Sequence, residues 1–105
     1  MKESGIITAI NHYLYYLENQ GKLVFTRNNS GAFINPRGNF FKMGRPGSPD
    51  FFIFLKGGKC LHIEVKNEKG RQNVRQINYE MKIANLGHRY CVVRSVDEVE
   101  RLINS

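Results

Sequence analysis

Apolar residues recur every three or four positions over the first part of the chain. This spacing predicts an amphipathic helix from Glu3 to Gln20, and Gly21 is a typical residue just beyond a helix end. The apolar positions are Ile6, Ile7, Ile10, Tyr13, Leu14 and Leu17. Together with Tyr16 they cover a wider face than one buried stripe requires, so the helix either lies deep in its own domain or offers an apolar surface to a second subunit.

The pattern then changes to short alternating runs with turn residues between them. Residues 22–27 and 32–34 predict two strands, and the Asn-Asn-Ser-Gly sequence at 28–31 predicts the turn of a hairpin that joins them. Residues 35–49 hold all three prolines and three of the ten glycines, together with several basic residues. We therefore expect a basic loop without regular structure in that segment.

The second half of the chain has stronger strand signals. Residues 51–55, 60–66 and 89–94 are apolar runs of strand length. The strand–helix–strand unit over residues 60–94 should have parallel strands. The order of elements predicts one α/β domain over residues 1–105, with a mixed sheet flanked by helices.

Two further helices have recognisable ends. Asn73 and Gln76 have the spacing of an N-cap and its helping residue, and Gly87 is the expected stop. The apolar stripe of this helix is formed by Val74, Ile77, Met81 and Ala84. Ser95 and Glu98 repeat the capping pattern and predict a last helix that extends through Ile103.

The charge of the chain narrows the choice of partners. Lys and Arg number 16 against 9 Asp and Glu, and the sequence pI is about 9.7. This charge suits nucleic acid or an anionic membrane surface as a partner. Many small basic proteins, however, have a basic solvent-exposed surface without any polyanionic partner. No apolar run has the length of a membrane span or of a signal-peptide core, so we expect a cytoplasmic protein with no membrane partner.

The cysteines and histidines point to no metal centre. Cys60 and Cys91 lie in apolar strand-like runs without metal-ligand spacing, and we expect buried, reduced thiols. His12, His62 and His88 match no ligand pattern either, and we expect structural roles for them.

The stretch GSPDFFIFLKGGKCLHIEVK, residues 47–66, carries the candidate chemistry. Residues two apart in a strand share a face, so Glu64 and Lys66 project together. A solvent-exposed edge strand would explain this pair simply. Asp50 offers another interpretation, because a hairpin could return Glu64 to its side. Two carboxylates at one point repel unless a cation intervenes, and hard oxygen ligands favour Mg²⁺ or Mn²⁺.

The length of the hairpin loop decides between these interpretations. A two-residue turn at Gly57-Gly58 would pair Asp50 with Val65 and point the two carboxylates apart. An odd loop, such as residues 57–59 with a bulge, would pair Asp50 near Lys66 and place all three charged groups on one face. We predict the odd loop.

These residues resemble a known nuclease family. Pro49-Asp50 followed by Glu64-Val65-Lys66 is similar to the PD-(D/E)xK signature. The later runs GRQNVRQ at 70–76 and GHRYCVVRSVDEV at 87–99 resemble the VRR-NUC branch, especially its small stand-alone phage and bacterial members. The resemblance covers nearly the whole chain and implies a restriction-endonuclease-like αβββαβ core.

The resemblance also implies roles for individual residues. It implies catalytic roles for Asp50, Glu64, Lys66 and Gln76, and metal ligation by Glu3, Asp50, Glu64 and the Val65 carbonyl. For two of these residues a simpler role stays open: Glu3 could complement the helix dipole, and Gln76 could be a cap partner.

Of the family's arginine motif, only Arg94 carries over. Flanking basic residues are candidates for DNA phosphate contacts, namely Arg27, Arg37, Lys42, Arg45, Lys69, Arg71 and Arg75. Phe40 and Phe41 are candidates for base stacking or wedging, although anchoring into the core is the commoner role.

The implied function is a Mg²⁺-dependent endonuclease that hydrolyses DNA phosphodiester bonds, with Mn²⁺ as a possible substitute. The resemblance implies branched substrates such as four-way (Holliday) junctions, a homodimer, and the cytoplasm of a bacterial or phage-infected host cell. A non-catalytic nucleic-acid-binding module is the main alternative, but such a module has no need for paired carboxylates that would repel a polyanion. A subunit with a decayed site is a third interpretation, disfavoured by the intact triad of Asp50, Glu64 and Lys66.

Overall fold

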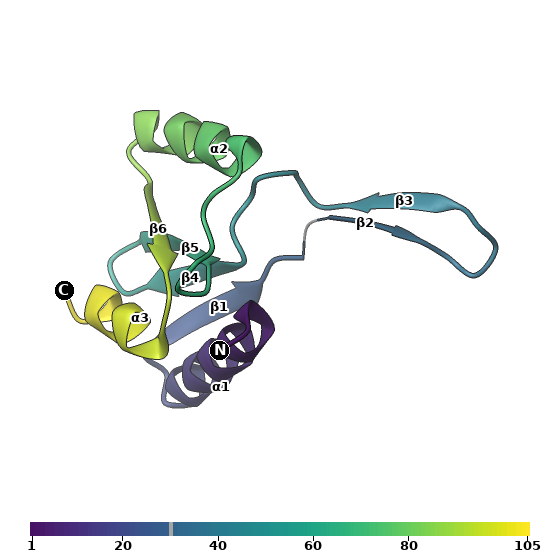
Figure 1. Ribbon diagram of the computed structural model, residues 1–105. Coiled ribbons are helices and arrows are strands. Elements are labelled where there is room, and N and C mark those ends of the chain that lie inside the picture. The colour runs from purple at the N-terminus through teal and green to yellow at the C-terminus, as the bar shows by residue number, and fades with distance from the viewer. Residues whose placement is uncertain (30) are drawn as a thin grey trace.

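The computed structural model describes residues 1–29 and 31–105 and consists of three helices and six strands (Figure 1). In chain order these are α1 (Glu3–Asn19), β1 (Leu23–Arg27), β2 (Gly31–Ile34), β3 (Phe40–Met43), β4 (Phe51–Leu55), β5 (Lys59–Val65), α2 (Val74–Asn85), β6 (Arg89–Val93) and α3 (Val96–Ile103). Ser30, part of the turn predicted at 28–31, lies outside the described residues. In the described part of the chain, no helix has the length and apolar character needed to cross a membrane.

A four-stranded sheet forms the centre of the protein, with strand order β1-β4-β5-β6. β4 is antiparallel to both β1 and β5, whereas β5 and β6 are parallel, so the sheet is mixed. The predicted fold class and the parallel strand–helix–strand unit are confirmed. β5 is an inner strand, and its residues 61–65 are all buried. The interpretation of residues 60–66 as a solvent-exposed edge strand is therefore wrong.

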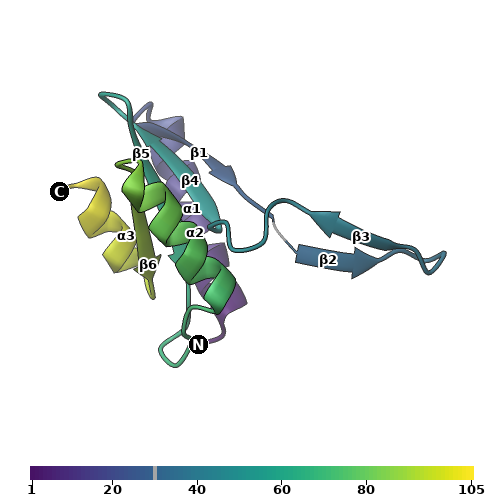
Figure 2. The same cartoon turned by 90° about the horizontal axis from the view of Figure 1, so that it is seen from above.

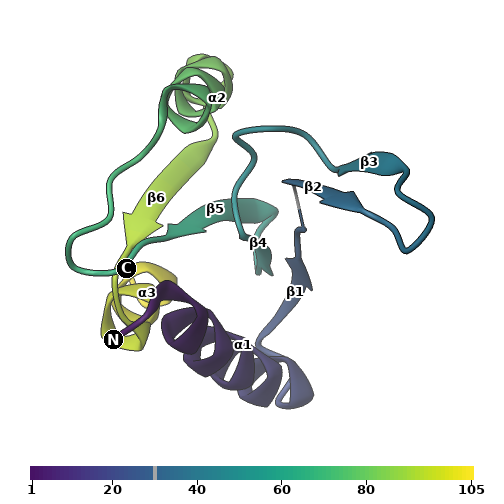
Figure 3. The same cartoon turned by 45° about the vertical axis from the view of Figure 1, so that its right-hand side comes forward.

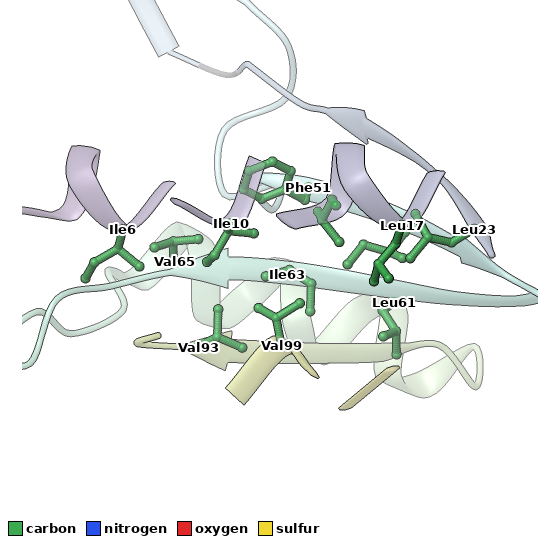
Figure 4. Packing of buried hydrophobic residues seen from close by; sticks show 12 residues of the cluster. Ile6, Ile10, Leu17, Leu23, Phe51, Leu61, Ile63, Val65, Val93 and Val99 are labelled. Atoms are coloured by element: carbon green, nitrogen blue, oxygen red, sulfur yellow. The ribbon is translucent and has the colours of Figure 1, made fainter. Parts of the chain in front are cut away.

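One face of the sheet packs against α1 and α3, and this layer is the hydrophobic core (Figures 3 and 4). Ile10 of α1, Ile63 of β5 and Val99 of α3 are fully buried and meet in this layer. Ile7 and Tyr13, which widen the apolar face of α1, are partly buried against the same core. The broad apolar face of α1 is thus mostly used inside its own domain.

The other face of the sheet carries α2, whose orientation differs from the prediction. Its ends are as predicted: Asn73 and Gln76 form a reciprocal capping box, and Gly87 follows with a φ of +89°. All residues of α2 are described, and none of them is buried. The side chains that are partly covered are Gln76, Tyr79, Glu80 and Ile83, whereas the predicted apolar stripe of Val74, Ile77, Met81 and Ala84 is exposed.

The segment between β1 and β4 is a second correction. β1 does not pair with β2, as predicted, but with β4, where Leu23 and Phe25 reach the core. β2 instead pairs with β3 in a separate two-stranded sheet that projects from the domain, hereafter the arm (Figure 2). The predicted irregular loop over 35–49 therefore contains a strand, and its Pro-Arg-Gly sequence belongs to the turn at the tip of the arm.

Candidate active site

The β4–β5 hairpin brings Asp50 and Glu64 to the same face at its open end. Leu55 pairs with Lys59, so the loop has three residues, Lys56-Gly57-Gly58, and the predicted odd length is confirmed. The predicted position of the loop is one residue too late. The ladder runs to Phe51↔Ile63, which places Asp50 beside Glu64 rather than beside Lys66.

Glu64 is an acidic side chain buried at the centre of the sheet. Its side chain is only 3% exposed. Oε1 accepts a hydrogen bond from the Tyr90 hydroxyl at 3.1 Å, and Oε2 accepts one from Nε2 of Gln76 at 2.9 Å. Burial, followed by the nearby Asp50 carboxylate, raises the pKa of Glu64 from 4.5 to about 8, although Lys66 and Tyr90 oppose the shift.

Asp50 is held by the backbone of β5, the opposite strand of the hairpin. Its N–H donates to the Ile63 carbonyl at 2.8 Å, and its Oδ2 accepts the Val65 N–H at 2.7 Å. The Asn28 amide donates to Oγ of Ser48 at 2.9 Å and to the carbonyl of Pro49 at 2.8 Å, which ties the loop before Asp50 to β1. The position of Asp50 is therefore fixed before any ligand binds.

Lys66 and Gln76 complete the charged cluster. Lys66 Nζ lies 3.8 Å from Oε2 of Glu64 and its side chain is only 12% exposed. The Lys66 stem passes close to Gly70, where an added Cβ would lie 3.3 Å from the Cβ of Lys66. Gln76 acts twice: its Oε1 accepts the Asn73 N–H of the capping box and its Nε2 reaches Glu64. The two roles weighed for Gln76 are therefore compatible.

The carboxylates open into a pocket of about 360 Å³ between the sheet, the arm and the start of α2. Three acidic residues, Glu3, Asp50 and Glu64, and two basic residues, Lys42 and Arg75, line it. Among residues 1–29 and 31–105, however, no three His, Cys, Asp or Glu side chains are close enough together to hold a metal ion. Glu3 thus shares the pocket without completing a three-carboxylate group.

The donor chemistry of this pocket fits a hard divalent cation. Two carboxylates face one another, and one of them is buried with a raised pKa. A cation between them would remove the repulsion that causes part of that shift. Carboxylate and backbone carbonyl oxygens are ligands that Mg²⁺ accepts while keeping several waters.

The seven basic candidates for phosphate contacts do not gather in one place. Lys42 and Arg75 line the pocket, and Arg37 lies in the turn at the tip of the arm. Arg45 lies over the ring of Tyr79, 5.4 Å from its centroid. The remaining three lie elsewhere: Lys69 and Arg71 in the segment between β5 and α2, and Arg27 on β1.

Two arginines have structural contacts instead. Arg27 donates to the carbonyls of Asn28 and Asp50 at 2.6 and 2.8 Å, and lies 3.6 Å from Oδ1 of Asp50. Arg94 donates to the carbonyls of Asn67 and Gly70 and holds the turn that follows Lys66. Arg27 therefore supports Asp50, and Arg94 supports the segment that carries Lys66.

Two residues that position the carboxylates, Asn28 and Tyr90, are not predicted as site residues by the sequence. Its patterns indicate only a turn at Asn28 and a core strand at Tyr90. The period-two pattern of β6 does carry a signal for Tyr90. In a parallel pair with β5, it places Tyr90 on the same face as Glu64, where a buried hydroxyl needs a partner.

Among the residues that the structure describes, no histidine lines this pocket. His62 is buried on the α2 side of the sheet, edge-on to Phe52 and His88 with ring centroids 5.3 and 5.4 Å apart. Neither of its ring nitrogens has a hydrogen-bond partner among the described residues. Burial, followed by the nearby His88, lowers the pKa of His62.

Comparison with solved structures places the fold in a known group. A solved structure described as a VRR_NUC domain matches over 99% of this chain and 97% of its own length, with a TM-score of 0.66 and 21% sequence identity. No protein-family model and no curated protein matches the sequence. The chain therefore has the fold of a VRR_NUC domain, and the resemblance found in its motifs is confirmed at the level of the fold.

Proposed function

We propose that the protein is a metal-dependent DNA endonuclease that hydrolyses phosphodiester bonds. The observation that carries this proposal is the pair of Asp50 and Glu64 in a pocket that Lys42 and Arg75 also line. The pKa of Glu64 stays raised although Lys66 lies 3.8 Å from its Oε2, so a bound cation would further stabilise the charged pair. Basic residues at the same pocket suit the phosphates of a nucleic acid.

Each residue has a defined part in this proposal. Asp50, Glu64 and the Val65 carbonyl would hold Mg²⁺ or Mn²⁺, and Glu3 would contribute through water. The bound metal would supply an activated water and stabilise charge on the phosphoryl oxygens. Lys66 would orient the attacking water or stabilise the charge that develops in the transition state. Gln76 would fix the orientation of Glu64 through the 2.9 Å hydrogen bond.

Cleavage of labelled DNA with and without Mg²⁺ tests this proposal. We expect cutting with Mg²⁺ or Mn²⁺, binding without cutting in Ca²⁺, and no cutting in chelator. Asp50→Asn, Glu64→Gln and Lys66→Ala should each reduce cleavage by orders of magnitude while the protein still binds DNA. Glu68→Gln, a change in an exposed carboxylate outside the pocket, is the matched control and should cut normally. Full cutting in chelator, or normal cutting by all three variants, would contradict the proposal.

The rival function is a nucleic-acid-binding module without catalysis. It shares the basic residues but gives no reason for a buried Glu64 next to Asp50. The same assay separates the two, because a binding module would shift labelled DNA without ever producing a cut strand. That result would favour the rival.

The substrate we propose is branched DNA, such as a four-way junction, and the working unit we propose is a homodimer. Symmetric cuts on two strands need two sites related by a two-fold axis, and one chain offers one such pocket in its described part. The apolar stripe of α2 supports a dimer, because Val74 is 71% and Met81 60% exposed. α1 gives less support than its sequence suggested, since its apolar face packs mainly on its own sheet.

A further inference from the structure

The arm projects from the domain beside the active-site pocket, and its two faces differ (Figure 2). The register of β2 and β3 places Ala32, Ile34, Phe40 and Lys42 on one face, which we call the inner face, and Phe33, Phe41 and Met43 on the other, the outer face. Ala32 and Lys42 line the active-site pocket. The inner face therefore continues outward from the pocket.

The large apolar side chains on the two faces differ in packing and in exposure. On the outer face, Phe33 and Phe41 stack on one another with centroids 5.4 Å apart. On the inner face, Ile34 and Phe40 are 68% and 61% exposed, more than either ring of the outer pair. An isolated two-stranded ribbon is at best marginally stable in water, so two such apolar side chains on it indicate a surface for a partner.

The charge around the arm indicates which partner this is. Residues 19–49 contain no Asp or Glu but hold Lys22, Arg27, Arg37, Lys42 and Arg45. The arm of a second copy would bring the same basic residues to this surface and be repelled, whereas a polyanion would be attracted. Alternation of an exposed aromatic ring with basic groups suits a nucleic-acid strand, where rings stack on bases and cations contact phosphates.

The tip of the arm is ordered before binding. Oδ1 of Asn35 accepts the N–H groups of Arg37 and Asn39 at 3.0 and 2.8 Å, and the Asn35 N–H donates to the Asn39 carbonyl at 2.9 Å. Gly38 supplies the φ of +83° that this turn needs. The arm thus presents Phe40 without a large ordering cost.

We propose that the inner face of the arm binds a locally unpaired DNA strand, with Phe40 stacking on a base close to the scissile phosphate. This inference rests on the proposed nuclease function and names its substrate more closely: DNA with unstacked or splayed bases near the cut. Phe40 and Lys42 are two positions apart on the same face of β3, a distance of about 7 Å. The stacked base should therefore lie close along the strand to the phosphate at Lys42.

The protein has no tryptophan, which allows a direct test with matched reporters. Phe40→Trp and Phe41→Trp place one indole on the inner and one on the outer face of the same strand. Both are made together with Asp50→Asn so that DNA is bound and not cut. We expect a four-way junction to quench the fluorescence of the Phe40→Trp protein strongly and that of Phe41→Trp weakly, with less quenching by plain duplex.

The same experiment separates failure of this inference from failure of the nuclease proposal. Binding is followed in parallel by anisotropy of labelled DNA, and cutting is measured on proteins with Asp50 intact. Equal quenching at both positions, or none at position 40 while the junction is bound, would overturn the role of the arm and leave the nuclease intact. No binding of any DNA would overturn both proposals.

Cleavage rates give a second, independent readout. Phe40→Ala should slow junction cleavage by about ten-fold or more, the size of one lost aromatic–base stack, and affect plain duplex less. Phe41→Ala on the outer face is the control and should have a smaller effect. Circular dichroism should show that both variants keep the fold. If the two variants lost the same amount of junction cleavage rate, the proposal that DNA binds the inner face would be contradicted.

Discussion

The Tyr90 hydroxyl donates a hydrogen bond of 3.1 Å to Oε1 of Glu64, and so connects the edge strand β6 to the carboxylate at the centre of the site. Gln76 holds the other oxygen of the same carboxylate. Burial, followed by the Glu64 charge, raises the pKa of Tyr90, so it stays a protonated donor. The two donors satisfy the buried Glu64 carboxylate and fix its plane, and the proposed metal would need a carboxylate oriented in this way.

Tyr90→Phe should therefore weaken metal binding more than it lowers the stability of the fold. We expect the Mg²⁺ concentration for half-maximal cleavage to rise by about ten-fold or more, the usual size for loss of a ligand's supporting hydrogen bond. Tyr79→Phe, which changes the ring packed 6.1 Å from Tyr90, is the control. An unchanged Mg²⁺ dependence in Tyr90→Phe would show that this hydrogen bond does not support metal binding.

Glu64→Gln should stabilise the metal-free protein at alkaline pH. The pKa of Glu64 is raised from 4.5 to about 8, so the folded state binds its proton more tightly than the unfolded state does. Stability from this group is complete below about pH 4.5 and is lost as the pH rises toward 8. The neutral amide removes this loss, and we expect Tm in chelator at pH 8 to rise by about 5 °C or more, with a smaller gain at pH 5.

The control for this measurement is Glu68→Gln, because Glu68 is exposed. It should leave Tm nearly unchanged at both values of pH. The raised pKa of Glu64 would be contradicted if the wild-type protein had the same Tm in chelator at pH 5 and pH 8, and if the Tm of Glu64→Gln never exceeded it.

Gly47→Ala should disturb the contact between the loop before Asp50 and the start of α2. Gly47 has a φ of +86°, and an added Cβ would lie 2.3 Å from the carbonyl oxygen of Arg75. Either the loop or α2 has to move, which displaces Asp50 or Gln76. We expect a loss of about 1–3 kcal/mol in the free energy of unfolding, measured in urea, together with a loss of cleavage.

Gly57→Ala provides a matched control for the backbone strain. Gly57 has the same φ of +86°, but no atom of the described residues comes within 4 Å of its added Cβ. The difference between the two variants therefore isolates the close approach to Arg75. Equal losses of unfolding free energy in the two variants would mean that Gly47 is needed only for its backbone conformation.

The sequence predicted the parts of this fold that depend on local chemistry. The caps at Asn73 and Ser95 and the glycine after α2 were readable because each satisfies backbone groups within a few residues. The odd loop between β4 and β5 was predictable because side-chain direction alternates strictly along a strand. Alternation together with a three-residue loop places Asp50 and Glu64 on one face, whereas a two-residue turn would point them apart.

The parts that the sequence did not predict depend on distant partners. Periodicity shows that Ile77 and Met81 share a face of α2, but not whether that face meets the sheet or solvent. Chain neighbours suggested that β1 pairs with β2, whereas pairing with β4 lets Leu23 and Phe25 reach the core. The hydrogen bond from Tyr90 to Glu64 joins residues 26 positions apart and needed the parallel register.

The exposed stripe of α2 yields the last prediction, on assembly. If Ile77 and Met81 meet the same residues of a second copy, light scattering at micromolar concentration should give twice the 12.1 kDa of one chain. Ile77→Asp combined with Met81→Asp should produce a folded monomer, because two charges would be buried without partners. Tyr16→Asp on α1, which changes a side chain 61% exposed outside that stripe, should leave the dimer intact.

The monomeric variant should nick one strand of a four-way junction instead of cutting two symmetrically. A wild-type protein that is monomeric and still makes paired cuts would contradict the dimer, and a dimer lost only in Tyr16→Asp would move the interface to α1.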